Sequence, residues 1–364
     1  MFTKQYETAN KVFDGCDFVI QLGEDRQGTP IKLLQITDMQ FIDATHKRTP
    51  DRLRHDEDVA WHPDNFMAQC GNHITSLIVQ TKPDLIFITG DIVYGSFDDT
   101  GSTLEWFCAF MDSFEIPWAP TFGNHDNESA KGVDWQCAQF ESSKYCVFRR
   151  GNVSGNSNYS VGIAVGDELV RVLHMVDSNG CRATDQLCVI PKAGIYPDQL
   201  ALIEQHTKAI QEAQGKPIPA FMAFHIPTES FWLAEQEKGY IKQEQSFYTI
   251  GVDVPAQDND FGFRQEYFHP IKTECDFMDF LHKQHIDGVF VGHCHRISTC
   301  ISYENIRFVF GLKTGQYDYH LPGSLGGTLI TLNRDDFAVT HVPSLVPYAP
   351  MPGGASFFSG FFAE

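Results

Sequence analysis

The chain of 364 residues is 42% hydrophobic and carries a formal net charge of −20 at pH 7. This length and apolar content fit one α/β domain with a large core. The negative charge argues against a nucleic-acid partner, which needs a basic surface to displace counterions, and against binding to an anionic membrane surface.

The N-terminal residues and the cysteines bear on where the protein works. Residues 1–20 lack a basic segment followed by a long apolar run, so we expect no secretory signal and a cytoplasmic protein. The ten cysteines form no CxxC pair, which favours thiols in a reducing compartment over a disulfide framework. No apolar run approaches the roughly 20 residues that a membrane-spanning helix needs.

The N-terminal half predicts alternating strands and helices after a polar lead-in over residues 1–30. The predicted elements are, in chain order, an edge strand near 17–22, a buried strand at 31–37, a helix at 63–80, a strand at 84–89, a helix at 103–114 and a strand at 117–122. The charged residues 43–62 predict a long loop over a site. This β-α-β-α-β order predicts a parallel sheet with right-handed crossovers.

The C-terminal half predicts more strands, which we assign to a second sheet packed on the first. The predicted elements are strands at 159–165 and 169–176 joined at Gly166-Asp167, a helix at 196–214, a strand at 221–225, a helix at 273–285, a strand at 288–291, and strands at 306–310, 327–332 and 337–341 that close the second sheet. Residues 227–270 show no clear period and predict a long lid or specificity loop. We expect one domain over residues 31–342, with a tail at 343–364 that packs on it.

Five of the predicted strands share one feature, because each is followed at its carboxyl end by Asp, Asn or His. These side chains are Asp38, Asp91, Asn124, His225 and His293. In α/β sheets, ligands bind beyond the carboxyl ends of the strands. We therefore expect these side chains to line one site along one edge.

Seven side chains around these strand ends are candidate metal ligands: Asp38, Gln40, Asp91, Asn124, His225, His293 and His295. Mixed carboxylate and imidazole ligands suit Mn, Fe or Zn, and one bridging carboxylate would let the set hold two ions. Two ions roughly 3.5–4 Å apart can clamp a phosphoryl group and activate a shared hydroxide. His125, beside Asn124, is a candidate acid for the leaving oxygen, with Asp126 fixing its tautomer.

The motifs that contain these residues resemble those of calcineurin-like metallophosphoesterases. They are Asp38-Met39-Gln40, Gly90-Asp91-Ile92-Val93-Tyr94, Gly123-Asn124-His125-Asp126, His225 after a strand, and Gly292-His293-Cys294-His295. The runs 124–129, 224–227 and 313–317 are similar to the small purple-acid-phosphatase-related branch of that family. One such motif is only moderately specific, whereas five in order, each after a strand, are a strong signal.

The resemblance implies a four-layered α/β/β/α sandwich of two mixed β-sheets flanked by helices, with a dinuclear metal site. Asp38 and His295 would hold the first metal, Asp91 would bridge, and Asn124, His225 and His293 would hold the second. His125 would bind the phosphate or assist the leaving group. The implied reaction is hydrolysis of phosphate mono- or diesters by a metal-bound hydroxide.

Position 40 departs from the family pattern, because many relatives have His where this chain has Gln40. In one interpretation the Gln40 amide oxygen completes the first metal's ligands and Tyr94 only packs or hydrogen-bonds. In the other, the Tyr94 phenolate binds iron, as in purple acid phosphatases. We favour the first interpretation, since Gln40 would fill the space that a ligating tyrosine needs and oxygen-rich ligands suit Mn or Mg.

Three functions remain open at this stage. The leading hypothesis is a metal-dependent phosphomonoesterase that acts on a small phosphorylated substrate or a phosphoprotein. The alternative is a phosphodiesterase or nucleotide pyrophosphohydrolase on the same site. A third is a non-catalytic binding module that has lost its metals, which Gln40 alone supports. A single Asp38 or His225 would more often be structural, but seven such residues together argue for a site.

Overall fold

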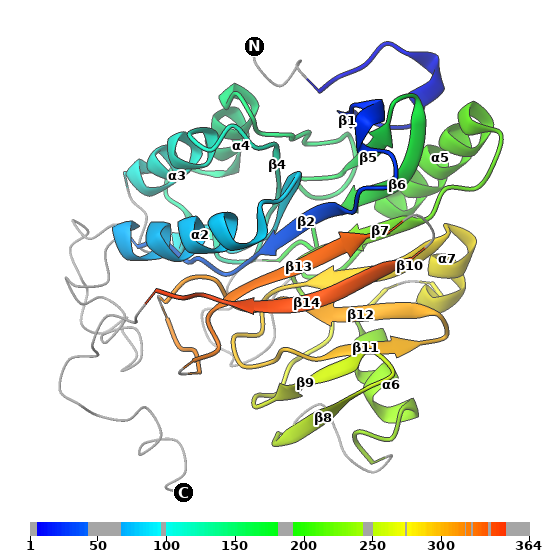
Figure 1. Cartoon of the computed structure of the whole chain (residues 1–364). Helices are drawn as coiled ribbons and strands as arrows, with labels where there is room; N and C mark the ends of the chain where they lie inside the picture. The colour runs from blue at the N-terminus through cyan, green and yellow to red at the C-terminus, as the bar shows by residue number, and fades with distance from the viewer. Residues whose placement is uncertain are drawn as a thin grey trace, which may run out of the picture.

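The computed structural model describes residues 6–42, 67–95, 100–180, 192–242, 250–273, 275–316, 318–321, 323–333 and 336–346 (Figure 1). These residues form two β-sheets, one of nine strands and one of five. The nine-stranded sheet has the order β1 (Phe18–Leu22), β5 (Tyr159–Val165), β6 (Glu168–Met175), β7 (Ala220–Ala223), β10 (Ile286–Val291), β12 (Ile306–Phe310), β11 (Cys300–Tyr303), β9 (Asp260–Arg264) and β8 (Val252–Gln257). The five-stranded sheet has the order β14 (Phe337–Pro343), β13 (Gly326–Leu332), β2 (Ile31–Ile36), β3 (Leu85–Thr89) and β4 (Trp118–Thr121).

Parallel strands form the centre of each sheet. In the five-stranded sheet β2, β3 and β4 run parallel, while β13 pairs antiparallel with β2. In the nine-stranded sheet β6, β7, β10 and β12 run parallel to one another. Every residue of β3 and β7 is buried, as expected for parallel strands covered on both faces. The carboxyl ends of β2, β3 and β4 therefore share one edge, and those of β7 and β10 share another.

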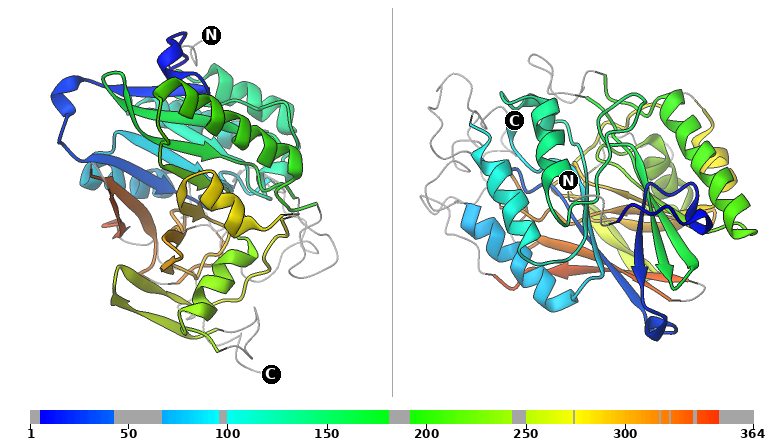
Figure 2. Two further views of the ribbon diagram at one scale, coloured as in Figure 1. Left: turned by 90° about the vertical axis from the view of Figure 1, so that its right-hand side faces the viewer. Right: turned by 90° about the horizontal axis from the view of Figure 1, so that it is seen from above.

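Helices cover the outer face of each sheet, so the molecule has four layers (Figures 1 and 2). Helix α2 (Met67–Thr81) packs on β2 and β13, and α3 (Ser102–Asp112) packs on α4 (Val133–Ser142). On the other side, α5 (Pro197–Gln214), α6 (Glu229–Glu237) and α7 (Phe277–Lys283) pack on β6, β11 and β10 respectively. Short 3-10 turns lie at Lys11–Phe13, Glu24–Arg26 and Asp126–Glu128.

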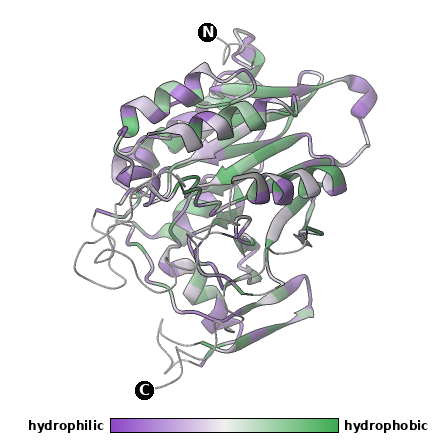
Figure 3. Cartoon of the chain, turned by 90° about the vertical axis from the view of Figure 1, so that its left-hand side faces the viewer, coloured by the Kyte–Doolittle hydropathy of each residue, from purple (hydrophilic) through white to green (hydrophobic). Residues whose placement is uncertain are grey.

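The inner faces of the two sheets meet in an aromatic core. The ring of Phe87 on β3 lies edge-on to Phe290 on β10, with centroids 5.6 Å apart, and Phe290 lies 5.1 Å from Phe221 on β7. Hydrophobic residues concentrate on the central strands, whereas the helices carry both kinds of residue (Figure 3). Each such side chain contributes on the order of 1.5–3 kcal/mol by burial. This packing fixes the position of the end of β3 relative to the end of β10.

The predicted four-layered sandwich is confirmed, and so are the β5–β6 pair and α5, which starts at Pro197. The assignment of the last strands is wrong in part. Strand β12 joins the second sheet, but β13 and β14 return to the first, where Leu332 of β13 lies opposite Ile31 of β2. Alternation along a strand predicts which side chains are buried, not which sheet receives the strand, because that depends on distant partners.

Regular structure also occurs where the sequence predicted loops. Residues 227–270, predicted as one long loop, contain α6 and the β8–β9 hairpin, which extends the nine-stranded sheet through β11. The edge strand predicted near residues 17–22 is confirmed as β1, which pairs in parallel with β5. The predicted loop at 43–62 and the tail beyond residue 346 lie outside the described residues. In the part of the chain that the structure describes, no helix has the length and apolar character that a membrane crossing requires.

Candidate metal centre

The backbone turns sharply where the candidate ligands follow their strands. Asp38, Gln40, Asp91 and His293 have positive φ angles of 54°, 50°, 52° and 71°. This left-handed conformation is uncommon for residues other than glycine and costs on the order of 1–3 kcal/mol at each position. Such strain persists where the surrounding structure holds it, and here it turns side chains from separate strands toward one place.

Two glycines allow these strand ends to approach one another. At Gly90, with φ +89°, a Cβ atom would lie 2.7 Å from the amide nitrogen of Gly123 and 2.8 Å from His225 Nδ1. At Gly292 a Cβ atom would overlap Thr37 Oγ1 and lie 2.7 Å from Asp38 Oδ2. Only glycine leaves room for these contacts.

Asp91, His225 and His293 form the tightest group of candidate ligands. One ligand atom from each lies within 4.8 Å of the others, and Asp91 and His225 are buried. His225 Nδ1 lies 2.6 Å from the carbonyl oxygen of Thr89, and a hydrogen bond to that carbonyl leaves Nε2 facing Asp91 Oδ2 at 3.2 Å. A backbone carbonyl commonly fixes the tautomer of a metal-binding histidine in this way.

Two buried oxygen atoms test whether these residues fit a cation. Asp38 Oδ1 and Asn124 Oδ1 are among the buried polar atoms of the described residues that lack a hydrogen-bond partner, although His295 Nε2 lies 3.4 Å from Asp38 Oδ1. A buried oxygen left without a partner costs about 1–3 kcal/mol, so native structures rarely contain one without a compensating group. Both atoms belong to predicted ligands. The residues present therefore fit a metal centre.

His295 is arranged in the same way as His225. Its Nδ1 lies 2.9 Å from the carbonyl oxygen of Tyr319, and its Nε2 faces Asp38 Oδ1 at 3.4 Å. The backbone amide of His293 donates to Asp38 Oδ2 at 3.0 Å, which ties the end of β10 to the end of β2. The structure thus brings Asp38 and His295 together, as the sequence predicts.

The charge states of these groups also suit a cation. Burial acts against ionisation, yet His295 and His225 lower the pKa of Asp38 to about 2, and the pKa of Asp91 is lowered further by His225 and His125. Burial and the neighbouring His225 lower the pKa of His293 to about 3, so this imidazole is neutral and keeps a lone pair. Asp91 raises the pKa of His225 to about 9 against the effect of burial, so a cation at Nε2 would displace a proton.

Gln40 is buried at the candidate metal centre, and both ends of its amide are hydrogen-bonded to neighbouring side chains. Its Oε1 accepts a hydrogen bond from Lys313 Nζ at 2.7 Å, and its Nε2 donates to Asp91 Oδ2 at 3.5 Å. The oxygen is the atom of an amide that binds metals. In this structure Lys313 donates to the oxygen through which Gln40 would hold a metal. Gln40 as a ligand of the first metal stays a prediction.

His125 is held by a different carboxylate from the one predicted. Both carboxylate oxygens of Asp126 accept hydrogen bonds from backbone amides, at Asp91, Val93 and Gly123, so Asp126 fixes the loop rather than the imidazole. Instead, His125 Nδ1 lies 2.8 Å from Glu128 Oε2. Burial alone would lower the pKa of His125, but Glu128 and Asp91 raise it to about 9.

Tyr94 lies against the other side of this imidazole. The rings of Tyr94 and His125 stack with centroids 4.2 Å apart and an interplanar angle of 21°, and Tyr94 is buried. The stack fixes the plane of His125 while Glu128 fixes its rotation in that plane. Whether the Tyr94 phenolate also binds iron stays a prediction.

Glu128 and Lys313 have no role among the predictions made from the sequence. The signal for Glu128 was present, because it stands three residues after His125 and the chain makes a helical turn there. Lys313 lies just beyond β12, and no local pattern connects it with Gln40.

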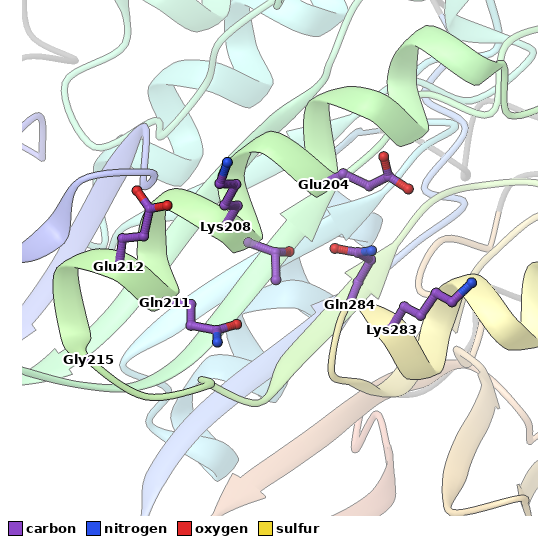
Figure 4. A pocket seen from close by; sticks show the side chains of 8 residues that line it. Glu204, Lys208, Gln211, Glu212, Gly215, Lys283 and Gln284 are labelled. Atoms are coloured by element: carbon purple, nitrogen blue, oxygen red, sulfur yellow. The ribbon is translucent and has the colours of Figure 1, made fainter.

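A separate hollow of about 600 Å³ lies between α5 and α7 (Figure 4). Lys208, Glu212, Lys283 and Gln284 are among its lining residues. These residues precede the starts of β7 and β10, whereas His225 and His293 follow the ends of the same strands. The hollow is therefore at the edge of the sheet opposite the candidate metal centre and is not part of it.

Comparison with known proteins agrees with this geometry. The family model described as calcineurin-like phosphoesterase matches residues 31–297. The chain belongs to the calcineurin-like phosphoesterase family. The matched range contains every strand end at which the candidate ligands stand.

Three individual proteins illustrate how similar this calcineurin-like phosphoesterase is to others. A protein from Arabidopsis thaliana named probable inactive purple acid phosphatase 28 is 34% identical over 82% of this chain and 73% of its own length. An uncharacterised protein from Schizosaccharomyces pombe is 26% identical over 62% of this chain, which spans only 42% of that protein. The crystal structure of a dimetal phosphatase from Danio rerio has a TM-score of 0.52 at 11% identity, covering 87% of this chain and 96% of its own, and shows the same fold.

Proposed function

We propose that this member of the calcineurin-like phosphoesterase family hydrolyses phosphate monoesters, carried by a small molecule or a phosphoprotein. The observation that carries the proposal is the convergence of Asp91, His225 and His293 from two sheets, with ligand atoms that lie within 4.8 Å of one another. His125 stands beside this group, since its backbone amide donates to Asp91 Oδ1 at 2.9 Å. A cation-binding group next to a held imidazole suits phosphoryl transfer to water.

The residues that fit a first ion are Asp38 and His295, and those that fit a second are Asn124, His225 and His293, with Asp91 shared. Two ions of Mn, Fe or Zn in these places would neutralise the phosphoryl oxygens and make water a stronger nucleophile. The chain's own contribution is to orient the ligands. The carbonyls of Thr89 and Tyr319 do this for His225 and His295.

His125 serves the leaving group. In hydrolysis, a water oxygen bonds to phosphorus, the bond from phosphorus to the ester oxygen breaks, and that oxygen takes up a proton. Glu128 holds Nδ1 of His125, so Nε2 is the nitrogen that can donate this proton. The side chain of His125 is 12% exposed, which leaves an edge accessible from the site. A positioned acid of this kind contributes roughly 10²- to 10⁴-fold to the rate.

The experiment that tests this proposal compares an aryl phosphate monoester with its diester. The protein is stripped of metal and then supplied with Mn, Fe or Zn. We expect metal-dependent cleavage of the monoester and a fall in kcat of roughly 10²- to 10⁴-fold in His125→Ala. His282→Ala is the matched control, because His282 lies on the surface of α7 and is 45% exposed.

Other outcomes decide between the alternatives. Faster cleavage of the diester would make the protein a phosphodiesterase or nucleotide pyrophosphohydrolase. Failure to take up two metals per chain, with no cleavage of either ester, would support a non-catalytic binding module. Two observations favour that third function: Lys313 donates a hydrogen bond to the oxygen of Gln40, and the Arabidopsis thaliana relative carries the name of a probable inactive phosphatase.

A further inference from the structure

A buried ammonium group lies beside the candidate metal centre. Lys313 is 2% exposed, and its Nζ donates hydrogen bonds of 2.7 Å to the carbonyl oxygen of Asp38 and of 2.7 Å to Gln40 Oε1. A lysine is almost never buried to this extent unless neighbouring groups compensate its charge. Burial lowers the pKa of Lys313 below its ordinary value, and the carboxylates of Asp38, Asp318 and Asp91 offset part of that effect.

The ammonium fixes the orientation of the Gln40 amide. Turning the amide over would place its NH₂ group against the Lys313 NH₃⁺ group, and neither can accept a hydrogen bond. In the observed orientation the NH₂ group instead donates to Asp91 Oδ2 at 3.5 Å. Gln40 therefore directs its oxygen to Lys313, and it presents a donor to the carboxylate that both ions would share.

The two predicted metal sites, each counted as one half of the centre, differ in their number of candidate ligands. One half has Asn124, His225 and His293 in addition to Asp91. The other half has only Asp38 and His295 besides Asp91, and a positive charge bonded to the backbone of Asp38 stands next to it. Fewer ligands and a nearby cation both weaken metal binding.

We propose that Lys313 makes the two metal sites unequal, so that the protein holds one ion tightly through Asn124, His225 and His293 and a second ion weakly through Asp38 and His295. This inference rests on the metal centre of the proposed function but not on catalysis. Lys313 acts as a positioning residue, through Gln40 and through its charge. Occupancy of the weakly binding site then depends on the metal concentration around the protein.

The test measures metal occupancy rather than turnover. Metal-free full-length protein is titrated with Zn²⁺ by calorimetry, and bound metal is counted after dialysis. We expect one tight equivalent and a second that binds at least about tenfold more weakly. In Lys313→Met the second equivalent should tighten by about tenfold, because the variant removes a positive charge that repels the ion. Lys283→Met, at an exposed lysine of α7, is the matched control.

Two further variants keep the proposal testable if Lys313→Met does not fold. Gln40→Glu gives the second ion an anionic oxygen and should also strengthen its binding, whereas Lys313→Arg keeps the positive charge and should leave that binding weak. His225→Ala should remove the tight equivalent and spare the weak one. Two equal equivalents in the wild type, or a ratio that Lys313→Met and Gln40→Glu leave unchanged, would overturn the proposal. Because the readout is bound metal, an inactive protein with unequal sites would refute only the proposed function.

Discussion

Glu128 Oε2 lies 2.8 Å from His125 Nδ1, one short helical turn along the chain. The contact joins a carboxylate to the imidazole that stands next to the candidate metal centre, and both side chains are largely buried. A buried carboxylate at this distance stabilises the protonated imidazole more strongly than an exposed one would. Glu128 therefore gives His125 both its orientation and its charge.

Replacing Glu128 by Gln should lower the pKa of His125. Glu128 is the largest of the groups that raise this pKa to about 9, so the variant should titrate closer to the ordinary histidine value near 6.5. NMR titration of the metal-free protein measures this directly. Glu304→Gln, which removes the exposed partner of His282, is the control and should leave His125 unchanged. An unaltered His125 in Glu128→Gln would show that Asp91 alone sets its charge.

The same contact should make stability depend on pH in a defined window. The folded-state pKa of His125 is raised above its unfolded value, so the stabilisation is complete below about pH 6.5 and is lost as the pH rises through about 9. We expect urea unfolding of the metal-free wild type to weaken over this window more steeply than unfolding of Glu128→Gln. Parallel curves for the two proteins would mean that the pair contributes nothing to folding.

The sequence predicts the ligands better than it predicts what holds them. Asp38 and Asp91 could be found because each follows an apolar run, and parallel strands bring their ends to one edge. The role of Lys313 could not be found, since it depends on a contact with Gln40 across 273 positions of the chain. For the same reason β13 was placed in the wrong sheet. The local sequence pattern predicts which residues are buried and where strands end, whereas sheet order and buried ion contacts depend on the assembled fold.

Asn124→Leu should separate metal binding from folding. Asn124 Oδ1 is buried without a hydrogen-bond partner among the described residues, and removing such an atom spares roughly 1–3 kcal/mol. We expect the metal-free variant to be at least as stable as the metal-free wild type. It should gain less from added Zn²⁺, which stabilises the wild type by about 2.7 kcal/mol at one hundred times the Kd. Thermal melts with and without Zn²⁺ measure both effects, and an equal gain in both proteins would exclude Asn124 as a ligand.

Tyr94→Phe should leave the metal content unchanged. The face of Tyr94 stacks on His125, and phenylalanine can make the same stack without the hydroxyl group. We therefore expect the iron-loaded wild type to show no visible charge-transfer band and the variant to bind the same amount of metal. A band in the wild type that disappears in Tyr94→Phe would identify the phenolate as an iron ligand and restore the second interpretation of this site.

Gly90→Ala should disrupt the centre, while Gly215→Ala should cost stability alone. Both glycines have positive φ angles, of 89° and 67°, so either substitution brings backbone strain on the order of 1–2 kcal/mol. At Gly215 a Cβ atom meets nothing within 4 Å, whereas at Gly90 it would lie 2.8 Å from His225 Nδ1 and 2.7 Å from the backbone of Gly123. The β3 end must then move away from His225, which carries Asp91 with it. We expect Gly90→Ala to lose more stability than Gly215→Ala in urea unfolding and to lose tight Zn²⁺ binding, which Gly215→Ala retains. Equal Zn²⁺ affinity in the two variants would show that the site does not depend on this close approach.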